Sequence, residues 1–182
     1  SSVLDIYQGT ADLSRRVLVY KMQGLSFREY IGMKLGIDLP AYTLEQIVNH
    51  EVELPIEIDH PLSLFNEYLR QGYYPFYEDE GYKMRLNQVV SITLETDIPQ
   101  YANYTVTISR KLKELMQVIA DSVPFKPNMS TIATTIKADR GLLPDYFELM
   151  EKAGLIAQLH DSTKGVRGLG KVEKVYLDNT NL

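Results

Sequence analysis

The clearest pattern in the chain is a spacing of apolar residues that fits α-helices. Leu62, Phe65 and Leu69 stand at i, i+3 and i+7, which places them on one face of a helix. We therefore expect a helix over about 61–71 that buries these three side chains. A further helix is expected over about 82–96.

Two capping-box sequences predict helix starts earlier in the chain. "SFRE" begins at Ser26 and "TLEQ" begins at Thr43. In each, the first side chain can accept a hydrogen bond from the backbone amide of the fourth residue. The fourth side chain can accept one from the backbone amide of the first. The first box predicts a helix over about 27–35, which Gly36 would close. Residues 25–100 are thus expected to form a small all-helical bundle.

The C-terminal part has a different order of elements. An apolar helix face ("KLKELMQVIADSVP") is followed by a helix that Asn128 would cap, a short turn, and a helix ending "DYFELMEKAGLI". Two strand-like segments, "LIAQLH" and "KVEKVYL", then flank a loop rich in Gly, Lys and Arg. This is the order of a winged helix-turn-helix. The buried positions expected on the two longer helices are Leu112, Leu115, Met116, Ile119, Tyr146, Phe147, Leu149 and Met150.

One apolar segment near the N-terminus does not fit either pattern. Val17–Gln23 ("VLVYKMQ") is apolar and rich in β-branched residues, which predicts a buried strand that Gly24 ends. Nothing before it in the chain could supply the other strands of a sheet. A self-contained protein is not expected to begin with a buried strand that has no partner.

Composition and charge narrow the functional classes. The 182 residues include no cysteine and three scattered histidines, so we expect neither a disulfide framework nor a metal site. The net charge of −5 is uneven: residues 1–106 carry 8 Lys and Arg against 15 Asp and Glu, and residues 107–182 carry 11 against 9. Two units with different partners are therefore expected, and the second permits nucleic-acid binding without requiring it. No apolar run is long enough to span a membrane and no signal peptide is visible, so we expect a cytoplasmic location without membrane contact.

A glycine-rich segment resembles a phosphate-binding loop but lacks its context. Gly165–Lys171 matches G-x-x-x-x-G-K. The next residue, Val172, has no hydroxyl to hold Mg²⁺. The segment that follows is strand-like, whereas a phosphate loop needs the N-terminus of a helix there. We interpret the segment as the loop of a wing.

Four stretches together resemble a known family. They are "SSVLDI" (1–6), "ADLSRRVLVYKMQGLSFREY" (11–30), "FNEYLRQGYYPF" (65–76) and "YFELMEKAGLI" to "KVYLDNTNL" (146–182). In this order and spacing they resemble the AAA-type ATPases of bacteria and archaea that carry a C-terminal winged helix and then a nuclease-like domain. The resemblance covers essentially the whole chain.

The resemblance implies a fragment with a mainly α (α+β) fold. Residues 1–24 would be the last strand of an ATPase core, 25–104 a helical lid domain, and 105–182 a winged helix that runs into a missing C-terminal domain. The phosphate loop and the Mg²⁺-binding acidic strand of the family lie upstream of the matching region. The parent would then be an ATPase using ATP and Mg²⁺, while the fragment itself would have no cofactor and no catalytic activity.

The resemblance also assigns roles to residues at the N-terminus. Arg15 or Arg16 would be the arginine finger that stabilises charge on the transferred phosphoryl group in the parent. The alternative for this pair is a solvated cap at a helix end. Ser1 and Ser2 would occupy the position of the polar nucleotide sensor.

The predicted winged helix leaves two kinds of partner open. Arg140 would begin the recognition helix, and cations of the wing would meet phosphates of double-stranded DNA. Against this, Asp145, Glu148 and Glu151 lie on the same helix and would repel a nucleic-acid backbone, so a structural or protein-docking role is the alternative. The candidate DNA-binding residues are Arg140, Lys164, Arg167, Lys171 and Lys174.

Two functional hypotheses follow. In the first, the chain couples the nucleotide state of the missing ATPase core to a DNA or protein partner. The chain would then contact that core and the missing C-terminal domain. This hypothesis is compatible with an oligomer. In the second, the chain is a self-contained winged-helix DNA-binding regulator with a helical N-terminal domain. The unpartnered strand favours the first.

Overall fold

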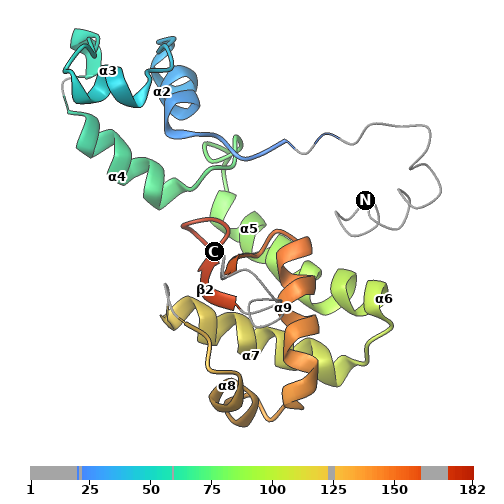
Figure 1. The fold of residues 1–182 in the computed structure, drawn as a ribbon. Coiled ribbons are helices and arrows are strands. Elements are labelled where there is room, and N and C mark those ends of the chain that lie inside the picture. The colour runs from blue at the N-terminus through green and yellow to red at the C-terminus, as the bar shows by residue number, and fades with distance from the viewer. Residues whose placement is uncertain (1–19, 21, 59, 123–125, 161–171) are drawn as a thin grey trace. The chain divides into compact units, whose positions relative to one another are not determined.

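The computed structural model describes residues 20, 22–58, 60–122, 126–160 and 172–182. Its elements are mainly helices with one two-stranded antiparallel sheet (Figure 1), which confirms the mainly α (α+β) class. The chain divides into a small unit, residues 21–82 with Asn181, and a large unit that contains residues 83–180. The predicted boundary between residues 104 and 105 therefore falls inside the large unit.

The small unit consists of short helices and their connections. Both predicted capping boxes are present: the side chain of Ser26 accepts from the amide of Glu29, and that of Thr43 accepts from the amide of Gln46. Gly36 ends the first helix in the left-handed conformation, with φ 69°, which glycine adopts without strain. The elements are α2 (Phe27–Leu35), α3 (Leu44–Val48), a 3-10 turn (Ile56–Ile58) and α4 (Pro61–Gln71).

The burial predicted for α4 is wrong: Leu62 and Phe65 are exposed, and Leu69 is only half-buried. The bounds of the helix match the prediction, but Leu62 is 77% exposed and Phe65 is 38% exposed. The aromatic rings of α2 reach α4 at Phe65 and Tyr68, with the Phe27 and Phe65 ring centroids 5.1 Å apart. This contact lies after the first turn of α4. Among the described residues, no element packs over Leu62 in that first turn.

The predicted strand Val17–Gln23 lies partly outside the described residues. Tyr20, Met22 and Gln23 are described and belong to no strand. Tyr20 and Met22 are almost fully exposed, so the prediction of a buried strand is wrong at these positions. A single extended segment has no stability without a hydrogen-bonded neighbour, and the described sheet contains only two strands from the C-terminal part.

The large unit begins with a helical stretch that changes type along its length. The predicted helix over 82–96 is α5 followed by a π-helical segment, and the chain continues directly into α6. The elements of this unit are α5 (Tyr82–Ile92), the π-helical segment (Thr93–Asp97), α6 (Ile98–Ala102), α7 (Val106–Ser122), α8 (Met129–Thr135), a 3-10 turn (Arg140–Leu142), α9 (Leu143–Lys152), β1 (Ile156–His160) and β2 (Val172–Leu177).

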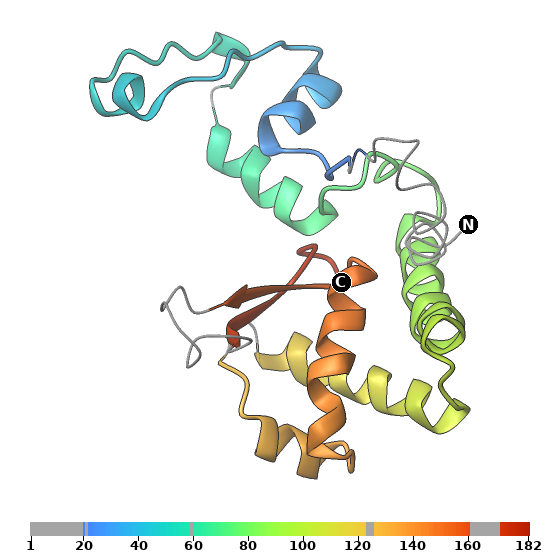
Figure 2. The ribbon, with the colours of Figure 1, turned by 45° about the vertical axis from the view of Figure 1, so that its right-hand side comes forward.

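One apolar core holds the large unit together. α7 and α9 contribute most of it, and every position predicted to be buried on these helices is at most 8% exposed. The same cluster includes Ile132 and Ala133 of α8 and Ile156 and Val175 of the hairpin. Leu94 and Ile98 belong to it as well. Figure 2 shows α7, α8, α9 and the two strands gathered in one body.

The two strands form an antiparallel hairpin. Ile156 pairs with Leu177 and Leu159 pairs with Lys174, with a shift in register after Leu159. The loop that joins the strands, which includes the Gly165–Lys171 motif, lies outside the described residues.

Candidate interaction surfaces

Two side-chain caps fix the α8 region: one starts α8, and the other lies in the connection between α8 and α9. The Asn128 side-chain oxygen accepts from the amides of Ser130 and Thr131, both at 3.1 Å, and starts α8. A carboxylate oxygen of Asp139 accepts from the amide of Gly141 at 2.7 Å. These local bonds form because Asn and Asp side chains readily satisfy the free amides at a helix start. They place Arg140 on the surface in the 3-10 turn Arg140–Leu142, and not in the first turn of α9, where the sequence prediction had it.

An open hollow lies beside this connection. It has a volume of 480 Å³ and contains one predicted DNA-binding residue, Arg140. Lys126 also lines it, and sequence reasoning missed this residue because it stands in no motif. The lining residues are Lys126, Pro127, Asn128, Met129, Ser130 and Arg140.

The positive charge near the hollow is partly neutralised. Lys126 forms an ion pair with Glu173 of β2, with a nitrogen–oxygen distance of 2.7 Å. Glu173 is the neighbour of Lys174, whose side chain is exposed. The other three predicted DNA-binding residues lie outside the described residues; they are Lys164, Arg167 and Lys171.

The solvent side of α9 is acidic. Tyr146, Phe147 and the apolar residues of α9 face the core, which leaves Asp145 and Glu148 exposed. Glu148 pairs with Lys152 at 2.6 Å. Glu151 accepts from the amide of Gln158 at 2.8 Å, which ties it to β1. The helix that sequence reasoning assigned to DNA recognition therefore presents carboxylates outward.

The predicted nucleotide-related residues are not described by the structure. Ser1, Ser2, Arg15 and Arg16 all lie outside the described ranges. Within those ranges, no group of three or more His, Asp or Glu side chains could hold a metal ion.

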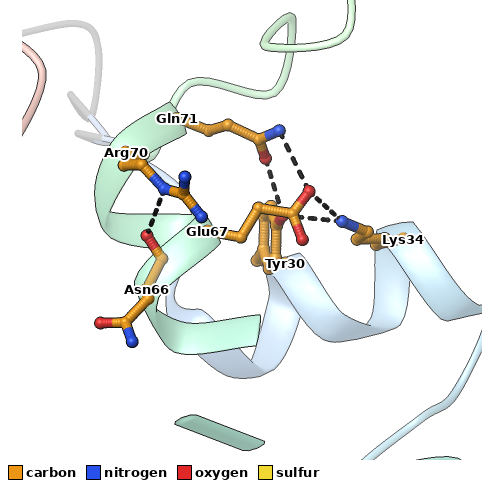
Figure 3. A network of polar contacts seen from close by, with 6 residues as sticks. All are labelled: Tyr30, Lys34, Asn66, Glu67, Arg70 and Gln71. Carbon is orange, nitrogen blue, oxygen red and sulfur yellow. Dashed lines mark hydrogen bonds and ion pairs between the residues drawn. The ribbon is translucent and has the colours of Figure 1, made fainter. Parts of the chain in front are cut away.

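A polar network in the small unit joins α2 to α4 (Figure 3). The Tyr30 hydroxyl donates to Oε1 of Gln71 at 2.7 Å. Lys34 donates to the same hydroxyl at 3.4 Å and forms an ion pair with Glu67. Gln71 in turn donates to Glu67 at 3.4 Å, which closes the ring of four side chains.

The electrostatics of this network fit a structural role. Burial raises the pKa of the Tyr30 hydroxyl, and the hydrogen bond from Lys34 opposes this only in part. The hydrogen bond with Glu67 is the main factor that raises the pKa of Lys34. Both shifts favour the protonated forms that make the observed bonds, so the network stabilises the α2–α4 contact rather than preparing a catalytic acid or base.

The aromatic residues that follow α4 also pack rather than form an open platform. The rings of Tyr73 and Tyr74 lie 4.9 Å apart, and those of Phe76 and Tyr82 lie 5.6 Å apart. Tyr82 is buried and its hydroxyl donates to the carbonyl of Gln71 at 2.7 Å. These ring contacts and the bond from the Tyr82 hydroxyl fit a packing role for the aromatic residues.

Comparisons with known proteins give one family and no further relatives. A family model described as Domain of unknown function (DUF8612) matches residues 62–182. No curated protein and no solved structure matches the chain. Among the described residues, no helix combines the length and apolar character that crossing a bilayer requires.

Proposed function

The chain belongs to the family described as Domain of unknown function (DUF8612), and we propose that its large unit acts as a winged helix that docks on protein. The small unit would serve as the helical lid of an AAA-type ATPase, whose core binds ATP and Mg²⁺. The chain would then transmit the nucleotide state of that core and perform no chemistry itself. The resemblance to these ATPases supports this proposal, together with two features of the large unit.

The first feature is the order of elements. α7, α8, a short turn, α9 and the β1–β2 hairpin follow one another as in a winged helix-turn-helix. Their apolar residues share one core, so the hairpin and the three helices form a single module.

The second feature carries the choice of protein over DNA. A recognition helix enters the major groove between two phosphate backbones, and duplex DNA carries one negative charge per roughly 1.7 Å of its axis. The exposed side of α9 presents Asp145 and Glu148. These carboxylates would be repelled by the groove, whereas a protein surface with cations would pair with them.

DNA binding is a second candidate because of the hollow beside Arg140. Arg140 and Lys126 both line it, and in the described part of the chain Arg140 forms no ion pair. The chain would then be the self-contained regulator, with contacts to double-stranded DNA through Arg140, Lys174 and the wing.

Fluorescence anisotropy with a labelled DNA duplex separates these candidates. At physiological salt we expect the chain to bind no more tightly than about 100 µM, the weak limit of non-specific association. The variant Asp145→Lys/Glu148→Lys should bind at least about tenfold more tightly, because it converts the repulsion into attraction. Glu114→Lys/Asp121→Lys is the matched control, since it makes the same charge change on α7 and should gain less.

Two results would contradict the protein-docking proposal. The first is salt-sensitive, micromolar or tighter binding by the unaltered chain that Arg140→Ala weakens, which would favour the DNA-binding regulator. The second is ATP binding by the chain in calorimetry, which would place a nucleotide site where the proposal has none.

A further inference from the structure

The segment between α2 and α4 exposes a group of large apolar side chains. Leu44, Ile47 and Val48 occupy positions i, i+3 and i+4 of α3 and so share one helix face. Their exposed fractions are 77%, 53% and 66%, and α3 contains no buried residue. Figure 2 shows this segment as a projection from one end of the α2–α4 pair.

Backbone bonds bring two further apolar residues to this projection. The amide of Glu51 donates to the carbonyl of Gln46, and the Tyr42 hydroxyl donates to the carbonyl of Glu53, both at 2.9 Å. The chain after α3 therefore folds back along it. Leu54 and Ile56 follow directly, 50% and 93% exposed. We call these five apolar residues the docking surface: Leu44, Ile47, Val48, Leu54 and Ile56.

α3 has only five residues, and with this face uncovered it gains little stability from packing within the small unit. Short helices are marginal in water and gain most of their stability from packing of the apolar face. In the described part of the small unit, the capping box of Thr43 holds the start of α3, while its apolar face has no covering element. Large apolar side chains left exposed together on one helix face are typical of a site of interaction.

Of Lys, Arg, Asp and Glu, the segment that carries the docking surface contains only the acidic residues. The sequence contains no Lys or Arg between Lys34 and Arg70. Glu45, Glu51, Glu53 and Glu57 are all exposed. Within the described ranges none of these four carboxylates forms an ion pair with a cation of the chain.

This combination selects one class of occupant. Nucleic acids and anionic membrane surfaces would be repelled by the carboxylates. A partner helix with apolar residues at i, i+3 and i+4 and with flanking Lys or Arg would cover the apolar face and pair with the carboxylates. We propose that the docking surface binds a basic amphipathic helix of a partner protein. The proposal goes beyond the proposed function and stands on the small unit alone.

The test is fluorescence anisotropy of the full chain with a labelled synthetic peptide, LKKLLKLLKKLLKL. We expect saturable binding that weakens as salt is raised. The acidic peptide LEELLELLEELLEL should not bind, because its apolar face is the same but its charge is reversed.

Matched variants locate the binding. Ile47→Ser/Val48→Ser should weaken it at least about tenfold, and helix propensity changes little because the three residue types rank together. Val89→Ser/Ile92→Ser is the control: these residues of α5 are 50% and 46% exposed, and their replacement should leave the affinity unchanged.

A second pair of variants tests the charge. Glu45→Gln/Glu53→Gln should weaken binding and flatten its salt dependence, whereas Glu80→Gln/Glu114→Gln should not. Absence of binding, or equal loss in test and control variants, would overturn the proposal. It would also be overturned if sedimentation showed a dimer that Ile47→Ser/Val48→Ser turns into a monomer, because the occupant would then be a second copy of the chain.

Discussion

Gly24 lies directly against the ring of Tyr73. A Cβ atom added at Gly24 would stand 1.9 Å from Cδ2 of that ring, and the amide of the next residue, Leu25, donates to the carbonyl of Tyr73 at 2.8 Å. The hydrogen bond holds the backbone too close to the ring for any side chain. Glycine is therefore required here by space.

We predict that Gly24→Ala destabilises the small unit by about 1–3 kcal/mol, the usual cost of overpacking. Urea denaturation followed by tyrosine fluorescence measures the change. Gly32→Ala is the control, because its added Cβ would meet only the carbonyl oxygen of Ile37 at 3.4 Å and alanine favours the helix by about 1 kcal/mol. Equal effects of the two changes would contradict the close contact at Tyr73.

The helix boundaries of the small unit could be predicted because their causes are local. A capping box is complete within four residues, so the sequence around Ser26 contains everything that fixes the start of α2. The exposure of Leu62 could not be predicted in the same way. Periodicity identifies an apolar face, but whether that face is covered depends on where α2 and its rings meet α4.

The pKa of Glu29 gives a second prediction. The backbone amide of Ser26, and then its side chain, hydrogen-bond the carboxylate and lower its pKa below the ordinary 4.5. A carboxyl group with a lowered pKa stabilises the fold above its unfolded pKa, and this contribution disappears as pH falls through the lowered value. An NMR titration of the Glu29 carboxyl should give a midpoint below 4.5. A midpoint at or above this value would argue against the capping box in solution.

Four buried or half-buried tyrosines of the small unit predict a loss of stability at alkaline pH. Burial raises the pKa of each hydroxyl above the ordinary 10.0, so the unfolded chain loses these protons at a lower pH than the folded chain. The associated stability is complete below pH 10 and is lost as pH rises through the raised values. The residues concerned are Tyr30, Tyr68, Tyr77 and Tyr82.

Absorbance at about 295 nm, where tyrosinate absorbs, should therefore show some tyrosines ionising late and together with unfolding. In concentrated urea the chain is unfolded, so the same titration should show a single step near the ordinary pKa of about 10. One step in the absence of urea would mean that these hydroxyls are accessible in the folded chain.

Asn128 provides a test of the large unit. Asn128→Ala removes the oxygen that accepts two amides of α8, and we expect a loss of about 1 kcal/mol in the free energy of unfolding. Asn128→Asp keeps the acceptor and should cost much less. Thermal denaturation of the three proteins under one set of conditions makes the comparison, and an unchanged midpoint for Asn128→Ala would rule out the cap.

The candidate surface of the large unit was only partly predictable. Arg140 could be identified because it stands at the start of an expected recognition helix. Lys126 could not, because its place beside Arg140 depends on how the segment before α8 returns to β2, where Glu173 binds it. Sequence also showed the acids of α9, but only the fold shows that Asp145 and Glu148 are the ones left facing outward.

The π-helical segment Thr93–Asp97 changes the direction in which the following side chains point around the helix axis. Residues in an α-helix advance about 100° each, so apolar residues placed every four positions, as at Val90, Leu94 and Ile98, drift about 40° per step around the axis. A π turn spreads its rotation over more residues, which offsets the drift accumulated from Val90 to Leu94 and keeps Ile98 on the side of both. Leu94 and Ile98 join the core, and Val90 packs against it. The number of residues in this segment thus sets which side of α6 faces inward, so its length is constrained more strictly than its composition.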